Sequence, residues 1–169
     1  LSDDMLPIAH HWQRIGARID GVYSGYLASP EQAQLLAQTL DCIAAPDTLV
    51  VIDPVMADNG SYYSQIDDRM CAAFRRLLSR ADVITPNVTE AALLLDRPYE
   101  EIRQADAYEV VRRLSLGGRR SVVLTGYSSE QGQTGALCFD RDSGESKAVQ
   151  TPREPQDFSG TGDLFTSVL

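Results

Sequence analysis

The stretch TLVVIDPV, residues 48–55, is a continuous apolar run that ends in Asp53-Pro54. A strand has this composition when both of its faces are buried, as in a parallel sheet covered by helices. ADVITPN at 81–87 and SVVLTGY at 121–127 have the same character. Together the three runs predict a parallel sheet at the centre of the chain.

Helical patterns separate these strands. Helices are expected from apolar spacing at 6–19, from Pro30 to Ile43, between Ile66 and Leu78, at 89–96 and at 108–116. The second of them has a clear start, because Ser29 offers a hydroxyl cap, Pro30 takes the first helical position and Gln32 the reciprocal capping position. The helix at 108–116 stops at Gly117-Gly118, which predicts a left-handed cap.

Two further stretches extend the sheet. GVYSGYL at 21–27 reads as a short strand, and TGALCFD at 134–140 and SKAVQTP at 146–152 read as a hairpin that adds an antiparallel edge. Alternating strands and helices predict an α/β fold with three layers, in which a mostly parallel central sheet has helices on both faces. Residues 1–169 are expected to form a single domain.

Composition narrows the classes of partner. The net charge is −9, and no Lys/Arg stripe is interleaved with aromatic residues, so nucleic acid is not expected as a partner. No apolar stretch approaches the roughly 18 residues of a membrane span, so no membrane partner is expected. Cys42, Cys71 and Cys138 lack CxxC spacing and are interpreted as buried free thiols of a cytoplasmic protein.

Polar residues follow the ends of the predicted strands. Asp53 leads into a loop with Asp58, and the next strand ends in Thr85-Pro86-Asn87 with Glu90 one turn further on. The third strand ends in Thr125-Gly126. Open α/β sheets bind ligands beyond the carboxyl ends of their strands. Any one of these residues alone is best explained as a turn former, but together they predict a ligand site at one rim.

Gly160-Thr161-Gly162-Asp163 precedes a predicted helix near the end of the chain. Glycines permit close approach of a ligand to the backbone, and the N–H groups that open a helix attract an anion. A carboxylate in such a pocket competes with the anion unless it faces a hydroxyl group whose proton must leave. The alternative is an ordinary aspartate in a first helical turn, where it is favourable to the helix dipole.

Four segments carry a family resemblance. DPVMADNGSYY at 53–63, DVITPNVTEAALLL at 82–95, VVLTGY at 122–127 and DFSGTGDLF at 157–165 resemble, in this order, the pyridoxal kinases of the ribokinase-like superfamily. The likeness runs from SGYL at 24–27 to the last residue. It implies ATP-dependent phosphorylation of the 5′-hydroxymethyl group of pyridoxal, pyridoxamine or pyridoxine, with ATP and Mg²⁺ required. By analogy it also implies a homodimer.

The resemblance implies a role for the glycine-framed turn. Asp163 would be the catalytic base that takes the hydroxyl proton, and the amides of Gly160, Thr161 and Gly162 would hold the transferring phosphoryl group. Tyr26 would lie near the pyridine ring of the substrate.

The resemblance also implies a site for ATP and metal. Asp58 would lie near the metal and the phosphates, with Asn87 and Glu90 acting on Mg²⁺ through water. Thr85 would lie beside them, and Thr125 toward the nucleotide. Mg²⁺ keeps several waters and needs only one or two carboxylates, so this diffuse arrangement suits it.

Several alternatives stay open. Members of that family are longer, so the chain is interpreted as a fragment, incomplete at both ends, that lacks an N-terminal strand region and C-terminal helices. Whether the chain alone is active, is a non-catalytic nucleotide- or vitamer-binding piece, or folds poorly without its missing ends stays open. A hydroxymethylpyrimidine kinase is the nearest rival reading, although such relatives often carry cysteine where Asp163 stands. Sugar kinases of the superfamily tend to show GAGD in place of GTGD.

Overall fold

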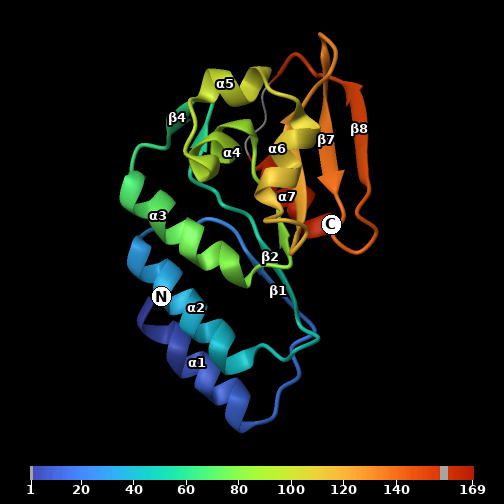
Figure 1. The fold of residues 1–169 in the computed structure, drawn as a ribbon. Helices are drawn as coiled ribbons and strands as arrows, with labels where there is room; N and C mark the ends of the chain where they lie inside the picture. Colours follow the sequence, from blue (N-terminus) through green and yellow to red (C-terminus); the bar gives the residue numbers. More distant parts are fainter. Residues whose placement is uncertain (1, 157–159) are drawn as a thin grey trace.

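A six-stranded sheet forms the centre of the protein (Figure 1). The computed structural model describes residues 2–156 and 160–169. The strand order is β1-β2-β5-β6-β7-β8, with β1, β2, β5 and β6 parallel and the last two pairings antiparallel. The strands are β1 (Gly21–Ser24), β2 (Leu49–Ile52), β5 (Val83–Ile84), β6 (Ser121–Tyr127), β7 (Gln133–Phe139) and β8 (Ser146–Pro152). The predicted mostly parallel α/β class is confirmed.

Helices surround this sheet, and α1, α2 and α3 stack on one another at its β1 side (Figure 1). The helices are α1 (Ser2–Arg14), α2 (Pro30–Ile43), α3 (Asp68–Leu77), the 3₁₀ helix η1 (Leu78–Arg80), α4 (Val88–Leu95), α5 (Tyr99–Gln104), α6 (Ala107–Leu114) and α7 (Thr161–Val168). A two-stranded hairpin, β3 (Ala57–Asp58) and β4 (Ser61–Tyr62), lies beside α4. Within the described ranges, no helix has both the length and the apolar composition needed to cross a bilayer.

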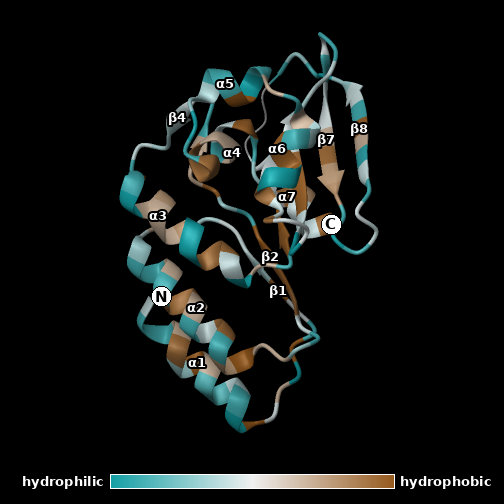
Figure 2. Cartoon of the chain, in the orientation of Figure 1, coloured by the Kyte–Doolittle hydropathy of each residue, from teal (hydrophilic) through white to brown (hydrophobic). Residues whose placement is uncertain are grey.

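The core lies between the sheet and its helices. Apolar residues gather on the central strands and on the helix sides that face them (Figure 2). The largest fully buried side chains include Phe74, Ile52, Met56, Met70, Ile84 and Val111. Burial of this kind stabilises a side chain by roughly 1.5–3 kcal/mol relative to exposure.

The strands differ from the predicted runs mainly in length. β6 coincides with 121–127, whereas β2 and β5 end before Pro54 and Pro86. Proline has no N–H to donate to a ladder, so each proline ends the regular pairing of its strand. The polar residues that follow are therefore held in loops at the strand ends.

Local signals at helix ends are confirmed with one change. The Ser29 hydroxyl accepts a hydrogen bond from the Gln32 backbone N–H at 3.3 Å. Gln32 Oε1 accepts from the backbone N–H of Ala28 at 2.8 Å, one residue before the expected partner. After α6, Gly117 and Gly118 have φ angles of +75° and +84°, the left-handed conformation that was predicted.

The first helix is displaced from its prediction. It was expected at 6–19, but α1 begins at Ser2 and ends at Arg14. Asp3 and Asp4 lie in its first turn, where carboxylates favour the positive end of the helix dipole. Gly16, with a φ of +64°, follows the end of the helix.

Arg120 links two helix ends beneath the sheet. Its side chain is 6% exposed, and burial lowers the pKa of Arg120 to about 10. Nε donates to the carbonyl oxygen of Leu114 at 2.8 Å, and Nη1 donates to that of Leu78 at 2.6 Å. The guanidinium thus supplies the donor for the carbonyl at the end of α6 and a second donor for Leu78 O, which also accepts from Ala81 N at 3.3 Å.

We predict that Arg120→Met destabilises the fold by about 1–3 kcal/mol, because it leaves the carbonyl oxygen of Leu114 without a donor and that of Leu78 with only the Ala81 N–H. The free energy of unfolding from chemical denaturation tests this. Arg119→Met, at the exposed neighbouring position, is the control and should change stability by less than about 0.5 kcal/mol. Equal losses of stability in both variants would show that the hydrogen bonds of Arg120 do not stabilise the fold.

Candidate active site

The carboxyl ends of the parallel strands meet at one rim of the sheet. Asp53 N donates to Ser24 O at 2.8 Å, and Thr85 N donates to Ile52 O at 3.4 Å. Thr125 N donates to Pro86 O at 2.9 Å, and Asn87 and Thr125 form an isolated parallel bridge. The structure therefore brings these polar strand ends together, as the sequence predicted.

The first turn of α4 fixes Asn87 and Glu90 relative to each other. Asn87 is the N-cap, and its Oδ1 accepts from Glu90 N at 2.9 Å. Glu90 Oε2 accepts in return from Asn87 N at 2.9 Å. This reciprocal capping box satisfies two of the N–H groups that a helix start leaves open.

The same two side chains hold the segment after β2. Glu90 Oε1 accepts from Met56 N at 3.0 Å, and Asn87 Nδ2 donates to Ala57 O at 2.8 Å. The hairpin β3–β4 follows, with Asn59 and Gly60 at its tip in the left-handed conformation, at φ angles of +50° and +79°. Two such residues are typical of the tight turn that suits a β-hairpin.

Asp58 stands on this hairpin, next to the start of α4. Its carboxylate is on the surface and accepts from the Asn59 backbone N–H at 2.8 Å and from Asn59 Nδ2 at 3.0 Å. The sequence indicated neither the hairpin nor its pairing, because strands of two residues are too short to show an alternating pattern. Asn59-Gly60 was the available signal.

Glu90 is a strongly perturbed acid of the rim. It is 3% exposed, and burial raises the pKa of Glu90 to about 8. Backbone N–H groups of Asn87, Met56 and Ala57 act in the opposite direction, since they favour the carboxylate. Asp53 adds to the increase by charge repulsion.

Asp53 is a rim residue to which the sequence assigned no function. Asp53 is 5% exposed and is close enough to Glu90 to repel its charge. Two buried acidic side chains therefore share this region. Such a pair is stabilised in its charged form by a cation. Across the part of the chain that the structure describes, no three His, Cys, Asp or Glu side chains group tightly enough to hold a metal ion directly. One or two carboxylates suffice for a hydrated Mg²⁺ ion, and the pair of Asp53 and Glu90 fits that requirement.

The start of α7 approaches the same rim. A Cβ atom on Gly162 would lie 3.9 Å from Asp53 Oδ2, and Thr166 Oγ1 lies 3.4 Å from Thr85 Oγ1. Gly160 is the N-cap at a φ of +81°, a conformation that favours glycine. Asp163 belongs to α7, but its side chain lies outside the described part of the structure, so its role as base stays a prediction.

Two predicted site residues, Thr125 on the rim and Tyr26 after β1, complete the placement. Thr125 precedes Gly126, whose φ of +68° accompanies a β-bulge between β6 and β7. That conformation explains a glycine at this strand end. Tyr26 follows β1 and is 53% exposed. Among the described contacts, no hydrogen bond joins Tyr26 to the rim.

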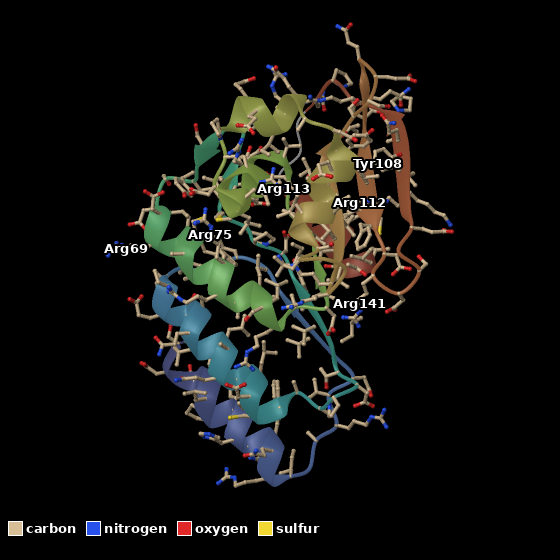
Figure 3. All side chains as sticks on the ribbon, in the orientation of Figure 1. Arg69, Arg75, Tyr108, Arg112, Arg113 and Arg141 are labelled. Carbon is tan, nitrogen blue, oxygen red and sulfur yellow. The ribbon has the colours of Figure 1, made fainter. Side chains whose placement is uncertain are left out.

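A separate groove of about 480 Å³ lies between α3 and the second half of α4. Arg75 reaches across it from α3 and donates to the carbonyl oxygen of Leu93 (Figure 3). Tyr62 donates to Asp68 Oδ1 at 2.9 Å, and Arg97 pairs with Glu101. None of the predicted site residues lines the groove, and these polar groups already bind one another. The rim is therefore the better candidate for chemistry.

Comparison with known proteins supports a kinase relationship. The family model described as phosphomethylpyrimidine kinase matches residues 12–169. A putative pyridoxal kinase of Caenorhabditis elegans is 33% identical over 88% of this chain and 46% of its own length. The chain thus spans about half the length of the curated relatives it matches.

Solved structures share the fold. A putative phosphomethylpyrimidine kinase from Bacteroides thetaiotaomicron, crystallised with pyridoxal, matches with a TM-score of 0.90 and 37% identity, covering 99% of this chain and 60% of that one. Pyridoxal kinase from Leishmania donovani, in complex with ADP and pyridoxamine, matches with a TM-score of 0.80 and 25% identity, covering 98% and 58%.

We predict that Glu90→Gln destabilises the protein by about 1–3 kcal/mol, because the new amide N–H₂ faces backbone N–H groups and leaves one of them unpaired. Chemical denaturation measures the change. Glu145→Gln is the matched control: Glu145 is exposed and its pair with Lys147 spans 3.8 Å, so its loss should be small. An unchanged free energy of unfolding in Glu90→Gln would show that the two hydrogen bonds from backbone N–H groups to Glu90 do not stabilise the rim.

Proposed function

The chain belongs to the phosphomethylpyrimidine kinase family, and from that premise we propose that it is part of an ATP-dependent kinase of vitamin B6. The reaction is transfer of a phosphoryl group to the 5′-hydroxymethyl group of pyridoxal, pyridoxamine or pyridoxine. The observation that carries the proposal is the approach of Gly162, at the start of α7, to Asp53 beside the capping box of Asn87 and Glu90. Relatives named as pyridoxal kinases, and structures with pyridoxal or with ADP and pyridoxamine, support it.

The start of α7 is the proposed cradle for the transferring group. Phosphoryl transfer through a loose transition state needs mainly positioning and neutralisation of charge. The amides of Gly160, Thr161 and Gly162 lie at or next to the positive end of the helix dipole. Because the chain carries a net charge of −9, local N–H groups of this kind must hold the phosphate against the field of the whole protein.

Asp58, Asn87 and Glu90 are the proposed residues toward Mg²⁺, acting largely through water, with Asp53 added from the structure. When bound, Mg²⁺ would neutralise charge on the phosphates. The two buried carboxylates, Asp53 and Glu90, are the structural reason to expect a cation here. A cation would favour the ionised form of both side chains.

The remaining residues divide between the two substrates. Thr85 and Thr125 lie on the strand ends beside Asn87, which suits contacts with the nucleotide. Tyr26 follows the neighbouring strand β1 and is proposed to contact the pyridine ring. Asp163 is proposed to accept the proton of the 5′-hydroxyl group. An aspartate suffices, because proton removal can be late in such a transfer.

A hydroxymethylpyrimidine kinase is the second candidate. The description of the matching family and that of the Bacteroides structure favour it. Asp163 favours the B6 reading, since pyrimidine kinases often carry cysteine there. Both reactions phosphorylate a hydroxymethyl group on a nitrogen heterocycle, so they can share one phosphate site. A non-catalytic nucleotide-binding piece is the third candidate.

We also propose a cellular location and an oligomeric state. Three free cysteines suit a reducing cytoplasm. A homodimer is proposed by analogy with pyridoxal kinases, and neither nucleic acid nor a membrane is proposed as a partner.

A kinase assay tests the function. We expect the complete protein that contains this chain, given Mg-ATP, to convert pyridoxal to pyridoxal phosphate with a higher kcat/KM than for hydroxymethylpyrimidine. Turnover of the pyrimidine alone would favour the second candidate, and turnover of neither with retained ATP binding would favour the third.

Asp163→Asn tests the proposed base. The variant should lower kcat by about 10²–10⁴-fold, the usual contribution of a general base, while the affinity for ATP stays close to wild type. Asp142→Asn, at a side chain that is 86% exposed, is the control and should leave kcat unchanged. Full activity in Asp163→Asn would rule out this assignment.

A further inference from the structure

We propose that Thr89 and Tyr99 are positioning residues that hold the β3–β4 hairpin, and with it Asp58, at the rim. The inference rests on the proposed function, because Asp58 matters there as a residue near Mg²⁺ and the phosphates. Neither Thr89 nor Tyr99 was among the residues predicted from the sequence. Both act through the hairpin backbone.

Thr89 reaches the tip of the hairpin from the first turn of α4. Its side chain is buried, with 4% of the residue exposed, and its Oγ1 accepts a hydrogen bond from Gly60 N at 3.0 Å. A hydroxyl group buried at this depth needs a partner. The partner it has is the main chain of the hairpin, two residues after Asp58.

Tyr99 supports the same glycine from α5. A Cβ atom built on Gly60 would lie 3.0 Å from Cδ1 of the Tyr99 ring and 3.3 Å from Cγ. The ring therefore packs against the open face of Gly60. The left-handed φ of +79° gives a second reason for glycine at this position.

Three side chains of one helical turn grip the segment along its length. Glu90 accepts from Met56 N, Asn87 donates to Ala57 O, and Thr89 accepts from Gly60 N. Asp58 lies between the second and third of these attachment points.

Asp58 depends on these attachments for its position. Its own carboxylate hydrogen-bonds to its neighbour Asn59. Strands β3 and β4 have two residues each, and a hairpin that short is not stable by itself. The contacts with α4 and α5 must therefore supply most of what orders the Asp58 backbone.

Thr89→Val tests the hydrogen bond in the complete protein, because valine keeps the shape and removes the acceptor. We expect the amide of Gly60 to exchange with solvent about tenfold faster. The affinity for ADP measured by calorimetry with Mg²⁺ should fall several-fold, while the affinity for pyridoxal is unchanged. Thr89→Ser keeps the acceptor and should restore both values.

Tyr99 provides an independent arm. Tyr99→Ala removes the ring and should accelerate Gly60 exchange and weaken Mg-ADP binding in the same way. Tyr99→Phe keeps the contacting carbons and should behave as wild type. Tyr108→Ala, at a tyrosine on α6 that is 41% exposed (Figure 3), is the matched control.

The outcomes separate two failures. Faster Gly60 exchange in Thr89→Val and Tyr99→Ala with unchanged Mg-ADP affinity would overturn the positioning role and leave a purely structural contact. Unchanged exchange would overturn the attachment itself. If the variants behave as expected and the wild-type protein binds Mg-ADP but phosphorylates no B6 vitamer, the proposed function is contradicted and the positioning role is not.

Discussion

The buried carboxylate of Glu90 is the contact on which the rim depends. One oxygen accepts from the N-cap amide of its own helix, and the other accepts from Met56 in the segment after β2. A carboxylate buried to this degree is costly unless its oxygens are satisfied, so this side chain holds both segments in place. Helix start, strand end and hairpin are therefore one unit, and Asn87 completes it by binding Ala57 O.

This unit has an electrostatic consequence. Asp53 and Glu90 are both buried; burial raises the pKa of Glu90, and the charge of Asp53 adds to the increase. A polyphosphate beside them would add more negative charge to a chain that already carries −9. Two features of the rim can offset that charge, namely the open N–H groups at the start of α7 and a cation drawn by the carboxylates. The proposed division between a glycine-framed phosphate cradle and a hydrated metal follows from this balance.

The sequence predicted the parts of the rim that local chemistry determines. Buried strands have a signature that holds in any fold, as the observed β6 illustrates. The Asn87–Glu90 capping box also has a local signature, although it was not predicted from the sequence. The contact of Thr89 with Gly60 joins residues 29 positions apart, which no local pattern records, whereas the short β3–β4 hairpin left only Asn59-Gly60 as a local signal. Asp53 was visible as a strand-end residue, but its closeness to Glu90 arises from the pairing of β2 with β5.

A kinase reaction has a donor half, which holds ATP and the transferring phosphate, and an acceptor half, which holds the substrate. The family assignment concerns the donor half, and the proposed substrate concerns the acceptor half. The two candidate reactions, phosphorylation of hydroxymethylpyrimidine and of a B6 vitamer, both deliver phosphate to a hydroxymethyl group on a nitrogen heterocycle, so the donor half can be common to them. We propose that the described rim belongs to that donor half, because its helix start and buried acids would act on charge. Choice of acceptor must come from groups that touch the ring or its hydroxyl. Tyr26, which follows β1 and is 53% exposed, and Asp163 are the proposed groups of that kind. The hypothesis of a B6 substrate therefore depends on these two residues, whereas the proposed donor site is independent of them.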